Sequence, residues 1–145
     1  MSAGRICSRI MATASPDEVV RAAARRMAEY DVGTLVVLKE ERGSRAVGLI
    51  TDRDIAIRCV AENRNPDDAL VSEIMTTPVH SVSDDTPIED ALVKMADAGT
   101  RRLIVTGEGG RVAGILTLDD VLDLLTREAA AIKRLLSKQQ PQVPA

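Results

Sequence analysis

The chain has 145 residues, of which 45% are hydrophobic and 28% are charged, and its formal net charge is −3. This composition predicts one folded core or two small adjoining cores. It argues against disorder and against a basic surface for nucleic acid or anionic lipid. Tyr30 is the single aromatic residue, so unpaired bases would find no stacking platform. A nucleic-acid-binding function is therefore disfavoured.

The sequence shows no membrane-spanning or secretory pattern. No apolar run approaches the roughly 20 residues that a membrane helix needs. The first residues, MSAGRICSRIM, lack the apolar stretch of a signal peptide. Cys7 and Cys59 form neither a disulfide framework nor a metal-binding motif, and we expect both to be small buried or half-buried thiols. We therefore expect a cytoplasmic protein without membrane contact.

The first half of the chain predicts the order helix, strand, strand, helix. An extended segment over residues 8–17 (SRIMATASPD) comes first and can add a short strand. Residues 19–30 then carry apolar side chains at helical spacing. Two β-branched runs, residues 34–38 and 46–51, predict strands, and residues 52–62 (DRDIAIRCVAE) predict a second helix.

The second half predicts the same order. An extended segment over residues 76–85 precedes a helix over 88–98, strands over 102–106 and 112–117, and a long helix over 118–136. One apolar stripe follows this last helix: Leu118, Val121, Leu122, Leu125, Ala129, Ile132 and Leu136. Because a single repeat cannot cover the whole stripe, its distal part should pack on the other half or on a second subunit.

The two halves are copies of one unit. Met27 aligns with Met95 at a shift of 68 residues, and Thr51 aligns with Thr117 at a shift of 66. The shift changes at the loop between the paired strands, where length variation is tolerated. An internal duplication follows, with domains over residues 1–68 and 69–137 and a frayed polar tail over 138–145.

The most similar stretches of the copies are GLITDRDI, residues 48–55, and GILTLDDV, residues 114–121. Their Thr-x-x-Asp pattern is a capping box, in which the hydroxyl and the carboxylate satisfy backbone N–H groups of a helix start. The same groups can bind a ligand, because a helix N-terminus attracts phosphate and a carboxylate accepts the hydroxyls of a vicinal diol. Residues 15–18 and 86–89 predict further capping boxes with Pro at the first helical position.

The duplicated unit resembles a pair of cystathionine β-synthase (CBS) domains, or Bateman module, over about residues 5–137. The resemblance implies an α+β (α/β) fold with pseudo-twofold symmetry. Each repeat is β-α-β-β-α, and the two pack through their sheets and leave two clefts. It also implies a regulatory module that binds an adenosine-containing ligand, such as AMP, ADP, ATP, S-adenosylmethionine or NADH, and signals to a protein target. CBS pairs commonly form homodimers.

By the same resemblance, the motif Asp holds the ribose hydroxyls and the Thr lies near ribose or phosphate. The halves differ, because Arg53 precedes one Asp, and Arg101 and Arg102 have no basic counterpart in the first half. These arginines can meet a phosphate or be solvated surface residues, and His80 can border the cleft or be a plain strand residue. The candidate ligand-binding residues are Thr51, Arg53, Asp54, His80, Arg101, Arg102, Thr117 and Asp120.

Catalysis finds little support in the sequence. No nucleophile has a histidine partner in a recognisable motif, and no histidine–cysteine cluster has metal-ligand spacing. We therefore expect no enzyme activity, no metal and no required cofactor. The alternative function is a ligand-free homodimeric scaffold. The expected dimer surface, which could instead be intramolecular core, comprises Val20, Ala24, Met27, Leu125, Ala129 and Ile132.

Overall fold

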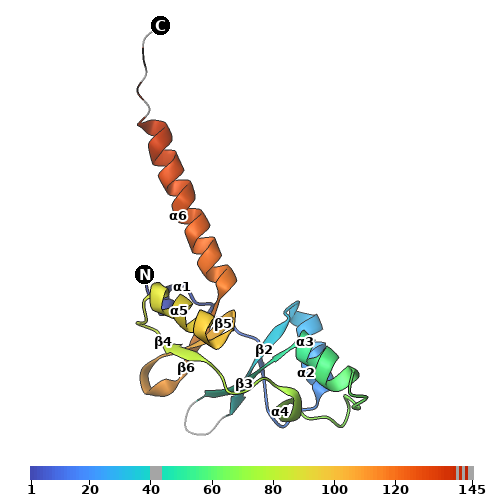
Figure 1. Cartoon of the computed structure of the whole chain (residues 1–145). Coiled ribbons are helices and arrows are strands. Elements are labelled where there is room, and N and C mark those ends of the chain that lie inside the picture. Colours follow the sequence, from blue (N-terminus) through green and yellow to red (C-terminus); the bar gives the residue numbers. More distant parts are fainter. Residues whose placement is uncertain (40–43, 140, 142, 144–145) are drawn as a thin grey trace.

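The computed structural model describes residues 1–39, 44–139, 141 and 143, and contains two three-stranded sheets flanked by helices (Figure 1). Two short helices, α1 (Ala3–Ile6) and α4 (Val71–Ile74), each precede one repeat in the chain. The first repeat then has β1 (Thr13–Ala14), α2 (Val20–Tyr30), β2 (Thr34–Lys39), β3 (Arg45–Thr51), α3 (Asp52–Asp54) and the π-helix η1 (Ile55–Val60). The second has β4 (Ser81–Ser83), α5 (Ile88–Ala98), β5 (Arg102–Thr106), the 3-10 turn η2 (Glu108–Gly110), β6 (Val112–Thr117) and α6 (Leu118–Lys138).

The two sheets have the same topology. In each, a short strand pairs in parallel with the middle strand, which pairs antiparallel with the third. A register shift interrupts the antiparallel pair after Val37 in one sheet and after Val105 in the other. These positions are again 68 residues apart, so the duplication predicted from the sequence extends to the irregularities. The predicted α+β tandem fold is confirmed.

Each repeat has its own apolar core. Leu35 and Val37 point into the first core, and Leu103 and Val105 point into the second. Side chains alternate between the faces of a strand, so the residues between them face away from these cores. Val36 is nevertheless only 2% exposed and Ile104 only 1%. This burial on the outer faces is what packing of the repeats through their sheets requires.

The repeats exchange their leading segments. The Gly4 N–H donates to the Asp84 carbonyl at 2.8 Å, and α1 lies against the second repeat. Conversely, Val71 and Ile74 of α4 belong to the core of the first repeat. After each exchanged helix the chain crosses back to its own repeat, and we call residues 7–12 and 75–80 the crossing segments. Matching isolated bridges anchor them to the sheets, Ser8 with Ile115 and Thr76 with Leu49. The division into 1–68 and 69–137 stays a prediction about the sequence repeat, and the packed units exchange these segments.

The capping boxes predicted for the first helices were wrong. Helices α2 and α5 have Val19 and Pro87 at their N-caps, with no side-chain cap. The exchanged segments explain this: the Val71 N–H donates to the Glu18 carbonyl at 2.9 Å, and the Ala3 N–H donates to the Thr86 carbonyl at 2.8 Å. Backbone N–H groups from the other half therefore bind the carbonyls of the residues that precede each helix.

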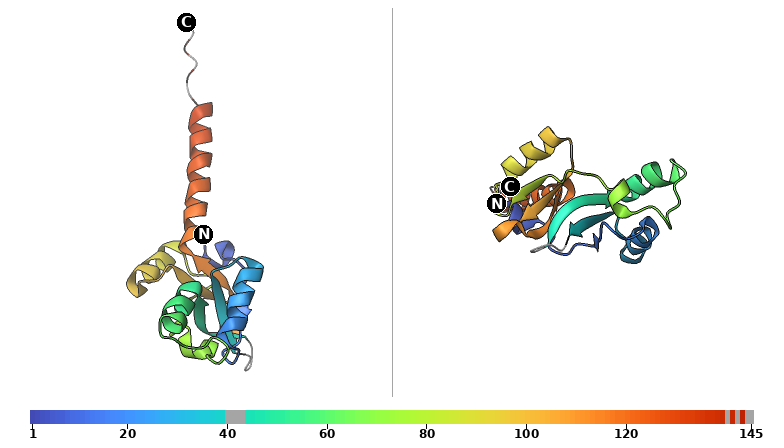
Figure 2. Two further views of the ribbon diagram at one scale, coloured as in Figure 1. Left: turned by 90° about the vertical axis from the view of Figure 1, so that its right-hand side faces the viewer. Right: turned by 90° about the horizontal axis from the view of Figure 1, so that it is seen from below.

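Helix α6 leaves the body of the molecule as a projecting rod (Figures 1 and 2). Val121 is its single buried residue, and residues 125–138 are all exposed. Within this chain, therefore, the other half does not cover the distal stripe. Among the described residues, no helix is long and apolar enough to span a membrane.

The structure also bears on the expectations for the two cysteines and for the C-terminal tail. Cys7 and Cys59 are free thiols, half-buried and buried respectively, as predicted. The predicted frayed tail includes residues 140, 142, 144 and 145, which lie outside the described residues, as do residues 40–43 of the longer hairpin loop.

Candidate ligand-binding site

Both Thr-x-x-Asp motifs form complete capping boxes where a strand runs directly into a helix. The Thr51 hydroxyl accepts from the Asp54 N–H at 3.1 Å, and Asp54 Oδ2 accepts from the Thr51 N–H at 3.0 Å. The Thr117 hydroxyl accepts from the Asp120 N–H at 3.1 Å, and Asp120 Oδ2 accepts from the Thr117 N–H at 2.9 Å. The capping interpretation therefore holds for both motifs, and the two carboxylates differ only in what else they contact.

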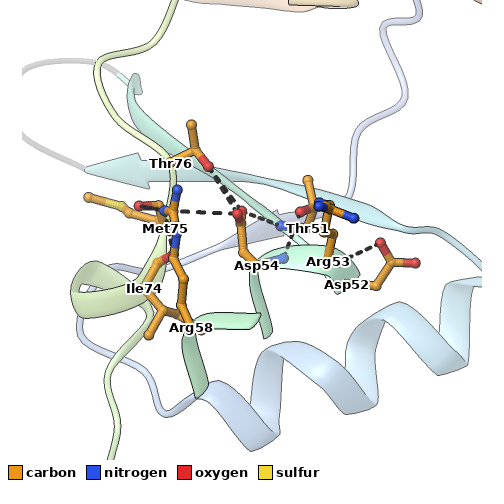
Figure 3. Close-up of polar contacts among 8 residues, drawn as sticks. All are labelled: Thr51, Asp52, Arg53, Asp54, Arg58, Ile74, Met75 and Thr76. Atoms are coloured by element: carbon orange, nitrogen blue, oxygen red, sulfur yellow. Dashed lines mark hydrogen bonds and ion pairs between the residues drawn. The ribbon is translucent and has the colours of Figure 1, made fainter. Parts of the chain in front are cut away.

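Further contacts occupy the Asp54 carboxylate (Figure 3). The Thr76 hydroxyl lies 3.1 Å from both carboxylate oxygens, and Arg58 Nη1 lies 3.8 Å from Oδ1. The Arg58 guanidinium is itself held by the carbonyls of Ile74 and Met75, at 3.1 and 3.0 Å. Asp54 is 8% exposed. Its acceptor capacity is largely used inside the protein.

The Asp120 carboxylate keeps an open oxygen. Among the described residues, no group forms a hydrogen bond or ion pair with its Oδ1, and this atom is not fully buried, so solvent can reach it. The residue that corresponds to Thr76 is Ser8, whose hydroxyl donates to the Ile10 carbonyl at 3.0 Å instead. The residue that corresponds to Arg58 is Leu124, which has no charge. These two substitutions leave Asp120 able to accept a hydroxyl from a ligand.

The basic pair of the second half lies beside the Asp120 motif. Arg102 is directly opposite Thr117 in the antiparallel pair of β5 and β6. The Arg101 carbonyl accepts from the Leu118 N–H at 2.9 Å, and its guanidinium lies 4.0 Å from the Asp119 carboxylate. The structure therefore brings Arg101, Arg102 and the Thr117–Asp120 motif to the N-terminus of α6.

Arg53 and His80 are placed elsewhere. Arg53 is an exposed residue at the start of α3, next to Thr51 (Figure 3). The His80 carbonyl accepts from the Ile104 N–H at 2.9 Å, and the residue is half-buried just before β4. The corresponding residue of the first half, Ala12, accepts from the Val36 N–H at 3.0 Å. His80 therefore lies on the crossing segment that leads into β4, where its backbone carbonyl binds the middle strand β5.

The motif glycines allow these crossing segments to approach the sheets. A Cβ at Gly48 would lie 2.5 Å from the Met75 sulfur, and a Cβ at Gly114 would lie 2.5 Å from the Ser8 carbonyl oxygen. The Gly at the head of each motif is therefore explained by the close passage of residues 7–8 and 75–76. Thr76 and Ser8 were missed from the sequence, although they align at the shift of 68 and both carry hydroxyls.

The surroundings of Asp120 also include a thiol. Burial raises the pKa of the Cys7 thiol, Arg9 opposes this rise, and the negative charge of Asp120 adds to it.

A cleft of about 1300 Å³ lies along residues 10–18, with Tyr30, Val47 and Met75 on other sides. Neither Asp54 nor Asp120 lines this cleft. The motif and the cleft are therefore separate features joined by the crossing segment after Ser8.

Comparison with protein families decides the identity of the fold. The model for the CBS domain matches twice, at residues 3–60 and 71–127. The chain belongs to the CBS domain family. An uncharacterised protein of Methanopyrus kandleri is 32% identical over 143 residues, which are 99% of this chain and 72% of that protein. The CBS domain-containing protein YhcV of Bacillus subtilis is 34% identical over 121 residues, or 83% of either chain.

Solved CBS structures share this fold. The CBS domain pair of protein MJ0100, in complex with 5′-methylthioadenosine and S-adenosyl-L-methionine, matches with a TM-score of 0.75 at 27% identity, covering 88% of this chain and 98% of that one. A CBS domain protein from Pyrobaculum aerophilum complexed with AMP matches with a TM-score of 0.73 at 25% identity, covering 87% and 99%. The resemblance predicted from the duplicated motif is confirmed.

Proposed function

We propose that the protein is a regulatory module that binds one adenosine-containing ligand, of the AMP, ADP, ATP, S-adenosylmethionine or NADH class, at the Asp120 motif. The open Oδ1 of Asp120 is the observation that carries this proposal. An ionised carboxylate with a free oxygen can accept from a ribose diol, and Arg101 and Arg102 can meet phosphate or carboxylate. The two related CBS structures with adenosine-type ligands support the ligand class.

The Asp54 motif is a weaker site in this proposal. A ribose that binds there must displace the Thr76 hydroxyl from a carboxylate that is 8% exposed. Buried polar groups that lose their partner cost free energy, so a ligand has to replace both the hydroxyl and part of the Arg58 attraction. One molecule per chain is therefore the expected stoichiometry. His80 and Arg53, which lie outside the Asp120 cluster, are predicted to contribute little.

The signalling role follows from where the motif sits. Thr117 ends β6 and Leu118 begins α6, so a ligand at Asp120 contacts the base of the projecting helix. Binding shifts the geometry of α6 only by the difference in ligand affinity between two arrangements. The readout is a protein target that senses this geometry, and no catalytic step or bound cofactor is required.

We also infer that the functional unit is a homodimer. Val20 is fully buried and Met27 is 6% exposed in the first core, so for these two residues of the expected dimer surface the alternative, intramolecular core, holds. Leu125 and Ile132 of α6 are 52% and 60% exposed. A related CBS protein, from bloom-forming cyanobacteria, is hexameric. Association therefore depends on α6 in this proposal.

The test is calorimetric titration with AMP, ADP, ATP, S-adenosylmethionine and NADH at one salt concentration, on protein freed of co-purified nucleotide. We expect saturable binding of at least one ligand at about one per chain. Asp120→Asn should weaken it roughly 10-fold or more, since a hydrogen bond to a charged group contributes about 1.5–3 kcal/mol. The 2′-deoxy analogue of the ligand should lose a similar factor, and Asp54→Asn is the matched control.

Two outcomes would contradict the proposal. Absence of heat and of thermal stabilisation with every ligand would favour the ligand-free scaffold. Binding that survives Asp120→Asn but is lost in Asp54→Asn would assign the ligand to the other motif.

A further inference from the structure

The exposed stripe of α6 has the spacing of a coiled coil. Its central positions are Leu122, Leu125, Ala129, Ile132 and Leu136, with steps of 3, 4, 3 and 4, and Leu118, four residues earlier, packs against the second core. This alternation, repeated every seven residues, is the pattern of two helices that pack along a shared seam. A helix that only covers its own domain keeps such a seam buried, whereas Leu122, Leu125, Ile132 and Leu136 are 49–61% exposed.

The projecting part of α6 has little reason to be helical on its own. Residues 125–138 extend about 21 Å beyond the body at 1.5 Å per residue, and all of them are exposed. Isolated helices of this length are marginal in water. Within α6, one ion pair, Arg127 with Asp123 at 2.7 Å, links the projecting part to the base of the helix. A partner along the seam would supply the stabilisation that the chain itself does not.

The charges of α6 identify that partner. Residues 119–128 carry four acids (Asp119, Asp120, Asp123 and Glu128) and one base (Arg127), for a net charge of −3. Residues 129–138 carry Lys133, Arg134 and Lys138 and no acid, for a net charge of +3. Two copies in antiparallel orientation place each acidic half against a basic half. Parallel copies place the two acidic halves together and the two basic halves together, which is destabilising, and a pair of Glu128 with Lys133 beside the seam would offset only part of this.

We propose that α6 pairs in antiparallel orientation with α6 of a second copy of this chain. In this register Leu122 of one protomer packs on Ile132 of the other, and Leu125 packs on Ala129. Beside the seam, Asp119 of one protomer lies next to Lys133 of the other. Glu128 lies next to its own copy at the crossing point, which is the one repulsive contact of this register.

The base of the helix is compatible with this arrangement. Val121 faces the core of its own repeat, at 1% exposed, whereas the neighbouring Leu122 is open. A second helix can therefore reach the seam down to Leu122 without displacing the contacts that hold α6 to the body. This inference rests on the proposed homodimer and does not depend on the proposed ligand.

The first experiment measures the dimer dissociation constant of the full chain by sedimentation equilibrium. We expect a dimer that Ile132→Gln weakens about 10-fold or more, because burial of an isoleucine is lost. Ala131→Gln, on the far side of the same exposed helix, should change the constant less than about 2-fold. A monomeric wild type would contradict both the homodimer and the pairing. A dimer that Ile132→Gln leaves intact would place the interface elsewhere and overturn the pairing alone.

Charge exchange then decides the orientation. Lys133→Glu should weaken the dimer, because the new carboxylate faces Asp119 of the partner helix. Adding Asp119→Lys should restore it in the antiparallel arrangement. In a parallel arrangement Lys133 would face Glu128 instead, so Glu128→Lys rather than Asp119→Lys would restore the dimer. That second result would overturn the proposal. Circular dichroism of each variant shows that the monomer fold is retained.

Discussion

The two motif aspartates show how identical residues acquire different roles from their neighbours. Asp54 and Asp120 cap their helices with the same geometry. Thr76 and Arg58 then fill the remaining capacity of one carboxylate, while Ser8 and Leu124 leave the other open. In this protein the neighbours of the motif, rather than the motif sequence itself, decide whether its carboxylate keeps an oxygen that a ligand could use.

This difference predicts unequal losses of stability. Asp54→Ala removes the helix cap, the hydrogen-bond acceptor of the Thr76 hydroxyl and the carboxylate near Arg58. We therefore expect the free energy of unfolding to fall by about 2–3 kcal/mol. Asp120→Ala removes only a cap, which contributes about 1 kcal/mol. Urea unfolding of the two variants measures both changes. Equal losses would show that the contacts of Thr76 and Arg58 add nothing to the cap.

The Thr76 hydroxyl is also predicted to keep the first site closed. Thr76→Ala should free the Asp54 carboxylate and raise the stoichiometry of ligand binding from about one toward two per chain. Ser8→Ala is the matched control, because Ser8 occupies the equivalent position and its hydroxyl does not contact Asp120. Calorimetry on both variants gives the comparison. An unchanged stoichiometry in Thr76→Ala would mean that something other than this hydroxyl closes the site.

At the scale of elements, the sequence predicted strands and helices well because hydrophobic periodicity is a local property. The predicted helix over 88–98 and the observed α5 share the same bounds. The failures have a common cause in chain segments that arrive from the other half. Backbone bonds of residues 3 and 71 occupy Thr86 and Glu18, so local capping signals there are overridden. The local sequence around Ser15 and Thr86 contains no signal for these long-range backbone hydrogen bonds.

The motif glycines predict a second asymmetry between the repeats. An alanine Cβ at Gly114 would meet the Ser8 carbonyl oxygen at 2.5 Å, and backbone cannot yield easily. At Gly48 the first obstacle is the end of the Met75 side chain, which is flexible. We therefore expect Gly114→Ala to destabilise the protein by about 2 kcal/mol or more, within the range for overpacking, and Gly48→Ala by less. Thermal unfolding of the pair tests the order, which a larger loss in Gly48→Ala would reverse.

Helix α4 carries a pH-dependent contact. The Glu73 carboxylate accepts from the Leu70 N–H at 3.1 Å and from the Arg64 guanidinium. The hydrogen bond from Arg64 holds the pKa of Glu73 below its ordinary value. Its contribution to stability is therefore complete above the ordinary pKa and disappears as the pH falls through the lower folded value. Glu73→Gln should be less stable than wild type at pH 7, and this difference should shrink progressively as the pH falls below the ordinary pKa of a glutamate, measured as urea midpoints. A constant difference would exclude this linkage.

For the whole molecule, the exchanged segments mean that the repeat in sequence and the packed unit in space differ. The sequence repeat begins near residue 1 and again near residue 69, because similarity follows the ancestral unit. The core of the first unit nevertheless includes Ala69, Val71 and Ile74, and that of the second includes Ala3. Similarity within one sequence detects copies, and it does not show which copy a linking segment packs against.

Two fragments of equal length separate these descriptions. Residues 1–68 make the first sequence repeat, and residues 10–77 make the first packed unit; each fragment has 68 residues. The second fragment keeps Val71 and Ile74, which are 0% and 1% exposed in the full chain, together with the Thr76–Asp54 contact. The fragment 1–68 lacks Val71, Ile74 and Thr76, and it carries α1 without the second repeat against which α1 packs. We therefore expect residues 10–77 to unfold cooperatively on heating and residues 1–68 to show no cooperative transition, followed by circular dichroism. If residues 1–68 fold as well as residues 10–77, the exchanged helices are not needed to complete the first core.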